Sequence, residues 1–227
     1  MKFTTFKHLK SQFHVLFIQG FLKDSSDWNK TTNGKYINIE QETQKIASTT
    51  LITFENGDYL LEINKICQLI WDYLLPCLIN KKLIIASHSY GSFYSYGLAN
   101  IYPKKITAMI LLDPSIKDQY YYDYLAEKIN LECDDEEIKK IYQYKLENYD
   151  NIAIIPIITN NIIVNVHLNV NTKKEIDYMY RHFSKLEYFG KLTNKNIKSN
   201  ISVHVNSSHM IHYKHPLEII LIISSLI

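Results

Sequence analysis

Short apolar runs of strand length recur along the first half of the chain, and turn residues separate them from polar or helix-like stretches. Four such runs span residues 14–19, 49–54, 83–86 and 106–112. Gly20 ends the first run, and Asp113-Pro114 stops the fourth. Apolar runs bounded in this way are typical of buried β-strands. The pattern therefore predicts four strands of a sheet core.

The stretches between these strands carry helical signals. The apolar positions at helical spacing in residues 59–79 are Leu60, Ile63, Ile66, Ile70 and Leu74. A helix is also expected over residues 91–102, which Pro103 ends, and in the second half of residues 29–48. Strands that alternate with helices are typical of a mostly parallel, doubly wound sheet with helices on both faces. The predicted fold class is therefore α/β.

The alternation is interrupted after Asp113. Residues 115–149 contain Tyr120-Tyr121-Tyr122 and an acidic run at residues 134–137, with lysines further on. Acidic residues first and basic residues later suit the dipole of a helix, so the run predicts a solvated helix face. We expect residues 115–149 to form a short helical cap insertion within a single domain that spans residues 1–227.

Two β-branched runs follow, at residues 152–158 and 162–168. Pro156 argues against a central strand in the first run, so the second is favoured. A helix is then expected over residues 173–188, a last strand over residues 201–205, and a closing helix from His215 onward.

Composition limits the function classes without choosing among them. Apolar residues make up 46% of the 227 residues and charged residues 21%, as in a soluble globular domain. Lysine and arginine number 25 against 23 acidic residues, so no basic excess indicates nucleic acid. Cys67, Cys77 and Cys133 have no metal-ligand spacing, and we expect no metal or cofactor.

The two ends of the chain lack membrane signals. Residues 1–13 have no apolar core of the signal-peptide kind, and the apolar tail at residues 217–227 is far shorter than a bilayer span. These features predict a soluble, cytoplasmic protein without membrane insertion.

The most specific chemical signal is Ser87-His88-Ser89-Tyr90-Gly91, which joins an apolar run to a helix-like segment. This is the pattern of a nucleophile elbow, in which a tight strand-to-helix turn exposes a serine. Small residues are needed on either side, at Ser87 and Gly91. Ser89 is therefore a candidate nucleophile, and a strand-to-helix turn with incidental serines is the alternative.

A serine nucleophile needs a base and donors for the oxyanion. His209 follows the last strand, at the sheet edge where the elbow also opens, and is the candidate base. Of His212 and His215, one is expected to face solvent and the other to cap the closing helix. The backbone amides of Tyr90 and Phe21 are the candidate oxyanion donors.

Three segments in this order resemble the α/β-hydrolase fold superfamily, in particular its small esterase-like members. Residues 19–28 are similar to its His-Gly-Phe loop with a later Asp-Trp, although Gln19 replaces the usual histidine. Residues 87–91 are similar to its Gly-His-Ser-x-Gly elbow, although Ser87 replaces the first glycine. Ser208-His209, followed by His215-Pro216, is similar to its terminal Gly-His and later proline.

The third member of a catalytic triad departs from the family pattern. The family acid usually follows the penultimate strand, but residues 169–172 contain no carboxylate, and Asn171 lies nearest the expected place. Some members take the acid from the end of the preceding strand, which is Asp113 here. An asparagine stabilises an imidazolium far less than an aspartate does. Asp113 is therefore the first candidate acid and Asn171 the second, while Asp177 comes too late in the chain.

The resemblance implies a serine hydrolase that cleaves a small ester or thioester by acyl transfer, with a small-molecule acyl substrate. Tyr120-Tyr121-Tyr122 would then line an acyl pocket or simply pack in the cap. The competing hypothesis is a catalytically weak or inactive binding protein on the same fold, since fold does not fix function. Cleavage of a C–C bond or a lactone is a third possibility.

Overall fold

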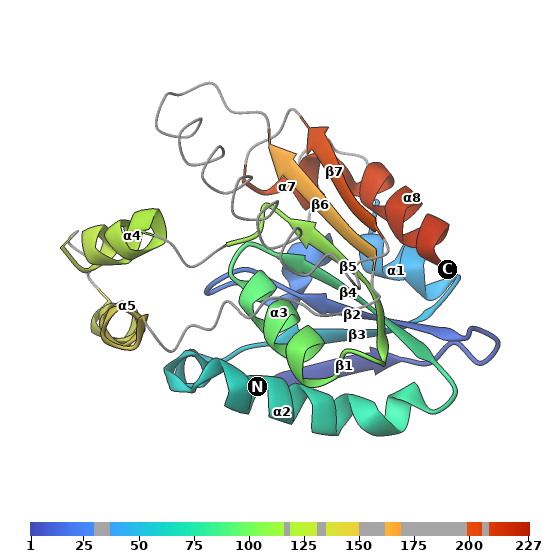
Figure 1. Ribbon diagram of the computed structural model, residues 1–227, viewed down its shortest axis with the longest axis horizontal. Helices are drawn as coiled ribbons and strands as arrows, with labels where there is room; N and C mark the ends of the chain where they lie inside the picture. Colours follow the sequence, from blue (N-terminus) through green and yellow to red (C-terminus); the bar gives the residue numbers. More distant parts are fainter. Residues whose placement is uncertain (30–36, 116–118, 131–134, 150–161, 169–198, 206–208) are drawn as a thin grey trace.

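The computed structural model describes residues 1–29, 37–115, 119–130, 135–149, 162–168, 199–205 and 209–227. Its centre is a seven-stranded sheet in the order β1-β3-β2-β4-β5-β6-β7 (Figure 1). The strands are β1 (Lys2–Phe6), β2 (Phe13–Ile18), β3 (Ser48–Thr53), β4 (Lys82–His88), β5 (Ile106–Leu112), β6 (Ile162–Leu168) and β7 (Ser199–Val205). β1 pairs antiparallel with β3, and every other pair is parallel.

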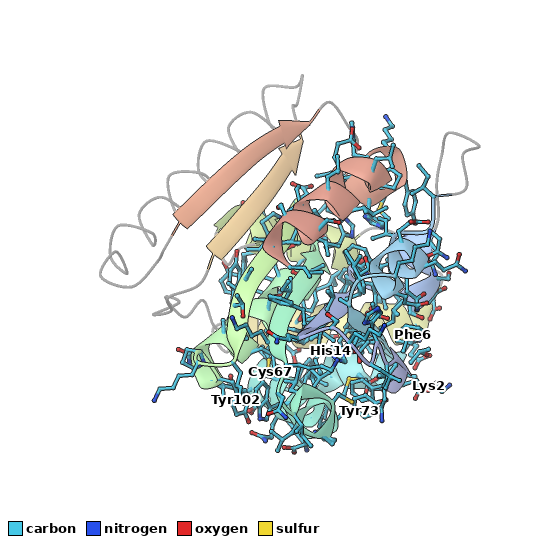
Figure 2. All side chains as sticks on the ribbon, turned by 90° about the vertical axis from the view of Figure 1, so that its right-hand side faces the viewer. Lys2, Phe6, His14, Cys67, Tyr73 and Tyr102 are labelled. Atoms are coloured by element: carbon cyan, nitrogen blue, oxygen red, sulfur yellow. The ribbon has the colours of Figure 1, made fainter. Side chains whose placement is uncertain are left out.

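Helices cover both faces of this sheet. α2 (Ile63–Leu74) and α3 (Gly91–Ile101) pack over one apolar core, and α1 (Ile39–Gln44) and α8 (Pro216–Leu226) over the other. Figure 2 shows this layering from the side, with Cys67, Tyr73 and Tyr102 around α2, on the other side of the sheet from α8. The fold class predicted from the sequence, a mostly parallel and doubly wound α/β sheet, is confirmed.

Short helical turns complete the framework. They are η1 (Ser25–Asn29), η2 (Asn56–Leu60), η3 (Leu75–Leu78) and α7 (Ile211–Lys214). None of the helices in the described ranges is long and apolar enough to cross a membrane.

Two further helices, α4 (Gln119–Asn130) and α5 (Glu136–Glu147), lie between β5 and β6 in the chain and stand apart from the two helical layers in Figure 1. The Asp135 carboxylate accepts hydrogen bonds from the amides of Glu137 and Ile138, at 3.0 and 3.2 Å, and so caps α5. The exposed acidic residues of the first turn favour the positive end of the helix dipole. The acidic run therefore begins a helix, as expected.

Two elements differ from the sequence predictions. β1 was not predicted, because its short polar segment forms an edge strand with alternating exposed and half-buried residues. The helix expected from Tyr59 begins only at Ile63, since the Glu55 and Asp58 side chains cap the separate turn η2. Leu60 is consequently 40% exposed and does not extend the core face of α2. The segments 152–158 and 173–188 lie outside the described residues.

The buried His14 on β2 makes the stability of the sheet dependent on pH. Its Nε2 lies 2.8 Å from Thr50 Oγ1 on β3. Burial, and secondarily the nearby Lys81 ammonium, lower the pKa of His14 from 6.5 to about 4. Because the unfolded chain takes up this proton at a higher pH than the folded one, the contribution of His14 is complete above pH 6.5 and is lost as pH falls towards 4.

We expect this protonation to cost about 3 kcal/mol of unfolding free energy at pH 4, from 1.36 kcal/mol per pKa unit. Urea denaturation of the wild type and His14→Gln between pH 7 and pH 4 measures it. The variant should lose less stability over this interval, and an equal loss in both proteins would exclude the contribution of His14.

Candidate active site

The turn between β4 and α3 has the geometry of a nucleophile elbow. Ser89 adopts a positive φ of 49°, a left-handed conformation that is strained for a residue with a side chain. The turn also passes very close to the end of β2. A Cβ on Gly91 would lie 2.7 Å from the Gln19 carbonyl oxygen and 2.8 Å from that of Ile18. Both separations are shorter than real contacts, so position 91 requires glycine.

Ser87 is accommodated in place of the family's usual glycine because its hydroxyl has a partner. The Ser95 hydroxyl on α3 lies 2.8 Å from the Ser87 hydroxyl, and both side chains are fully buried. A buried hydroxyl without a partner would be costly. The serine at this position therefore departs from the family pattern without disturbing the packing of β4 against α3.

Several hydrogen bonds fasten the elbow to the end of β5. The Ser89 amide donates to the Leu112 carbonyl at 3.0 Å, and the Ser115 amide donates to the Ser89 carbonyl at 3.2 Å. The Ser92 hydroxyl lies 2.7 Å from the Ser89 carbonyl oxygen and 2.9 Å from that of Ser115. Asp113 lies within this fastened segment and itself has a φ of 41°. Ser89 and Asp113 are thus parts of one backbone unit.

The structure brings two of the predicted triad residues together. His209 Nδ1 lies 2.5 Å from Asp113 Oδ2, across 96 residues of sequence. A carboxylate only accepts hydrogen bonds, so Nδ1 carries a proton, and in the neutral form of the ring the lone pair is on Nε2. In the parts of the chain described, the Ser89 hydroxyl makes no hydrogen bond to the His209 ring. Asn171, the second candidate acid, lies outside the described residues.

His88, the residue before the serine, holds the backbone of His209. Its Nε2 lies 2.8 Å from the His209 carbonyl oxygen, and the two rings lie 4.6 Å apart. Burial lowers the pKa of His88 well below its ordinary value, so the ring is neutral. Because a carbonyl accepts, the proton of His88 is on Nε2 and Nδ1 is unprotonated. His88 matches the histidine of the elbow pattern, but this role was not predicted from the sequence, because the contact spans 121 residues.

A buried network lies behind this pair. His212 Nε2 lies 3.2 Å from Asp27 Oδ2, and the Tyr213 hydroxyl donates to the other oxygen of the same carboxylate. His212 is 1% exposed, so the expectation that it or His215 would face solvent is wrong for His212. The hydrogen bond to Asp27 stabilises the His212 ring in its buried position. His215 occupies the N-cap position of α8, and its Nδ1 lies 3.1 Å from Glu218 Oε1.

Asp27, His88 and His212 are close enough to be considered as metal ligands, with one possible ligand atom of each within 4.8 Å of the others. However, the Asp27 carboxylate is hydrogen-bonded to two residues, and His88 Nε2 is bonded to a carbonyl. We interpret the group as a hydrogen-bonded network that fixes the segment on which His209 lies.

The side chains of Phe21 and Tyr90, whose amides are the predicted oxyanion donors, lie side by side. Tyr90 is the N-cap of α3, and its ring centroid lies 5.2 Å from that of Phe21. The Tyr59 hydroxyl accepts a 3.0 Å hydrogen bond from the Leu22 amide and so holds the loop after β2. Within the described residues, neither the Phe21 nor the Tyr90 amide has a hydrogen-bond acceptor.

The loop after β2 lies directly against the elbow. A Cβ on Gly20 would lie 2.9 Å from His88 Nδ1 and 3.4 Å from Ser89 Cβ. On its other side the loop contacts α5, where the Tyr142 ring centroid lies 5.1 Å from that of Phe21. The turns after β2, β4 and β5 and the segment after β7 therefore meet at one edge of the sheet, the carboxyl ends of its parallel strands.

Comparison with known proteins identifies the fold. No protein-family model matches the chain, and no curated protein sequence does. Solved structures match over nearly its whole length. MenH from S. aureus is 13% identical with a TM-score of 0.65, and the match covers 99% of this chain and 97% of that one.

Two esterase-related structures are similar to the same extent. A carboxylesterase from the thaumarchaeon Nitrososphaera gargenis is 12% identical with a TM-score of 0.66, covering 99% of this chain and 92% of its own. A lipase-esterase related protein from Clostridium acetobutylicum is 12% identical with a TM-score of 0.59, covering 100% and 99%. Identities this low establish the arrangement of the backbone and nothing finer. The chain therefore has the α/β-hydrolase fold.

Proposed function

We propose that the protein is a serine hydrolase that cleaves a small ester or thioester by acyl transfer, with Ser89, His209 and Asp113 as its triad. The observation that carries the proposal is the 2.5 Å contact between His209 and Asp113, beside a serine held at a φ of 49°. A strained, half-buried serine with an oriented imidazole at the same sheet edge is an arrangement that activates a nucleophile.

Each step of the proposed reaction uses one of the groups described above. His209 Nε2 takes the proton of the Ser89 hydroxyl while the oxygen attacks the carbonyl carbon, and the negative charge moves to the carbonyl oxygen. The amides of Tyr90 and Phe21 donate to this oxyanion, and the positive end of the 11-residue helix α3 adds to its stabilisation. The Asp113 carboxylate stabilises the imidazolium that forms.

The second half of the reaction reverses the proton transfers. The imidazolium gives its proton to the departing alcohol or thiol as the bond to the carbonyl carbon breaks, which leaves an acyl group on Ser89. His209 then removes a proton from a water molecule that attacks the acyl carbonyl. The acid product leaves, and the hydroxyl of Ser89 is restored.

Aromatic side chains supply the proposed wall of the acyl site. Phe21 packs against Tyr90, against Tyr59 of η2 and against Tyr142 of α5, with ring centroids 4.8–5.2 Å apart. We assign this wall to the loop, the elbow and α5. Tyr122 of α4 is 39% exposed and packs on Tyr149, and the side chains of Tyr120 and Tyr121 lie outside the described part of the chain. In this proposal residues 115–149 act as a cap over the site.

Labelling with a fluorophosphonate probe tests the proposal, since the probe bonds covalently to an activated serine. We expect the wild type to be labelled and Ser89→Ala not to be. Ser224→Ala, which removes an exposed serine on α8, is the matched control and should be labelled like the wild type. Absence of Ser89-dependent labelling would instead favour a binding protein on the same fold.

A substitution at Gly20 tests whether activity depends on the close approach of the loop after β2 to His88. A methyl group at this position meets His88 Nδ1 at 2.9 Å and must displace either the ring that holds His209 or the loop that carries the Phe21 amide. Since a displacement of about 1 Å can cost a factor of about 10² in rate, we expect Gly20→Ala to lower kcat for p-nitrophenyl butyrate by about 10- to 100-fold.

Gly57→Ala is the matched control, because a Cβ there meets nothing within 4 Å. It should leave kcat within about twofold of the wild type. Circular dichroism should show the same fold in all three proteins. Full activity in Gly20→Ala would mean that the loop and His88 do not need the observed close approach.

A further inference from the structure

The cap helix α5 carries a buried lysine, Lys145. Its side chain is 3% exposed, although lysine is seldom buried unless it is paired. The Nζ atom lies 5.2 Å from the ring centroid of Tyr90 and 5.8 Å from that of Tyr144. The ammonium group is therefore directed at the aromatic ring of the residue that follows the proposed nucleophile.

Lys145 has no anionic partner within the described parts of the chain. On the neighbouring turn η2, Asp58 is paired with the N-terminal amine at 2.7 Å. On α5 itself, Glu147 accepts a hydrogen bond from Gln143. Burial alone accounts for the pKa of Lys145, which falls from 10.5 to about 7. Cation–π contacts compensate only part of the cost of burying an ammonium group.

The position of Lys145 indicates where a missing anion would come from. Tyr90 donates its amide to the proposed oxyanion, so its surroundings contact the acyl half of a bound substrate rather than the remote end of the leaving group. We propose that Lys145 binds a carboxylate at the far end of the acyl chain, an inference that rests on the proposed function. The preferred substrate would then be a half-ester or half-thioester of a dicarboxylic acid.

A single carboxylate suits this environment better than a phosphate. One lysine ammonium is a compact point charge that balances one negative charge, whereas phosphates are usually held by several donors or by a bidentate arginine. The aromatic wall of Phe21, Tyr59 and Tyr142 supplies apolar contacts for the methylene groups between the scissile carbonyl and the carboxylate. The Lys145 ammonium group and the aromatic wall beside it thus fit an acyl chain that is apolar in the middle and charged at its end.

Two p-nitrophenyl esters that differ only in charge test the proposal: the hydrogen glutarate and the methyl glutarate. A charge-assisted hydrogen bond in a buried site is expected to favour the anionic ester by about 10- to 100-fold in kcat/KM. In Lys145→Met, which keeps the packing volume, this ratio should fall to about 1, while hydrolysis of the methyl glutarate ester stays within about threefold. Lys140→Met, on the exposed face of the same helix, should keep the wild-type ratio.

A binding measurement separates this inference from the proposed function. Calorimetric titration of Ser89→Ala with monomethyl glutarate and with dimethyl glutarate requires no turnover. Tighter binding of the monomethyl ester, lost in Ser89→Ala/Lys145→Met, would support the role of Lys145 even if neither p-nitrophenyl ester were hydrolysed. Equal affinity for the two ligands, or a preference that survives in the double variant, would overturn it. 4-Carboxyphenyl butyrate carries its carboxylate on the leaving group instead of the acyl chain. If Lys145 favoured only this ester over the uncharged one, the carboxylate would not be bound at the end of the acyl chain, and the proposal would be overturned.

Discussion

Replacing Ser89 with alanine is expected to lower kcat/KM for p-nitrophenyl butyrate by about 10³-fold or more. In the proposed mechanism the substitution removes the atom that would form the acyl-enzyme, whereas the amides of Tyr90 and Phe21 and the aromatic wall remain. Substrate binding should therefore change little, and the loss should appear in kcat. Any residual rate should not show a burst of p-nitrophenol, because no acyl-enzyme can accumulate.

Stability and a matched serine provide the controls for this result. The Ser89 side chain is not hydrogen-bonded within the described residues, and alanine has the same strained φ here, so Ser89→Ala should unfold at about the wild-type temperature. Ser224→Ala should keep wild-type kinetics. An Ser89→Ala protein with more than about one tenth of the wild-type rate would remove Ser89 from the mechanism.

Asp113→Asn is expected to lower kcat by about 10²- to 10⁴-fold with little change in KM. The amide nitrogen of asparagine can donate to His209 Nδ1, which would move the ring proton to Nε2, the atom that must accept the proton of Ser89. The neutral side chain also no longer stabilises the imidazolium. Burst kinetics at several pH values would show slow acylation across the whole range.

Two comparison variants decide between the candidate acids. Asp72→Asn removes a carboxylate on the exposed face of α2 that accepts a hydrogen bond from Gln68, and it should keep wild-type activity. Asn171→Ala should also leave kcat unchanged if Asp113 is the acid. The reverse pattern, with Asn171→Ala slow and Asp113→Asn active, would assign the orienting role to Asn171.

The central strands and their order in the chain could be predicted because their apolar runs are continuous and bounded by turn residues. Residues 106–112 and 162–168 were predicted with the bounds that the structure has. β1 could not be predicted in the same way, since a polar edge strand is stabilised by pairing with β3 and carries little apolar pattern of its own. Likewise, the start of α2 depends on how the Glu55 and Asp58 side chains cap η2, which helical spacing does not contain.

The candidate site was predictable where a motif has a local backbone requirement. The spacing around Ser89 reflects such a requirement, and His209 followed from its place after the last strand. The proposal of Asp113 as the acid rests on a contact across 96 residues, which only the folded chain brings about, and Asn171 lies outside the described residues. The roles of His88 and Lys145 were not predicted, although His88 matches the histidine of the elbow pattern, because these roles arise from burial and from neighbours on other elements.

The position of Asp113 has a consequence for how such a chain can diverge. In the proposed mechanism the nucleophile and the acid belong to turns fastened to each other by the hydrogen bonds of Ser89, Ser92 and Ser115. In the family that the sequence resembles, the acid usually follows the penultimate strand; here the long stretch between β6 and β7 would then carry no catalytic residue. Mutations and changes of length in that stretch would escape selection on the chemical step, so it can evolve separately from the reaction that the rest of the sheet edge performs.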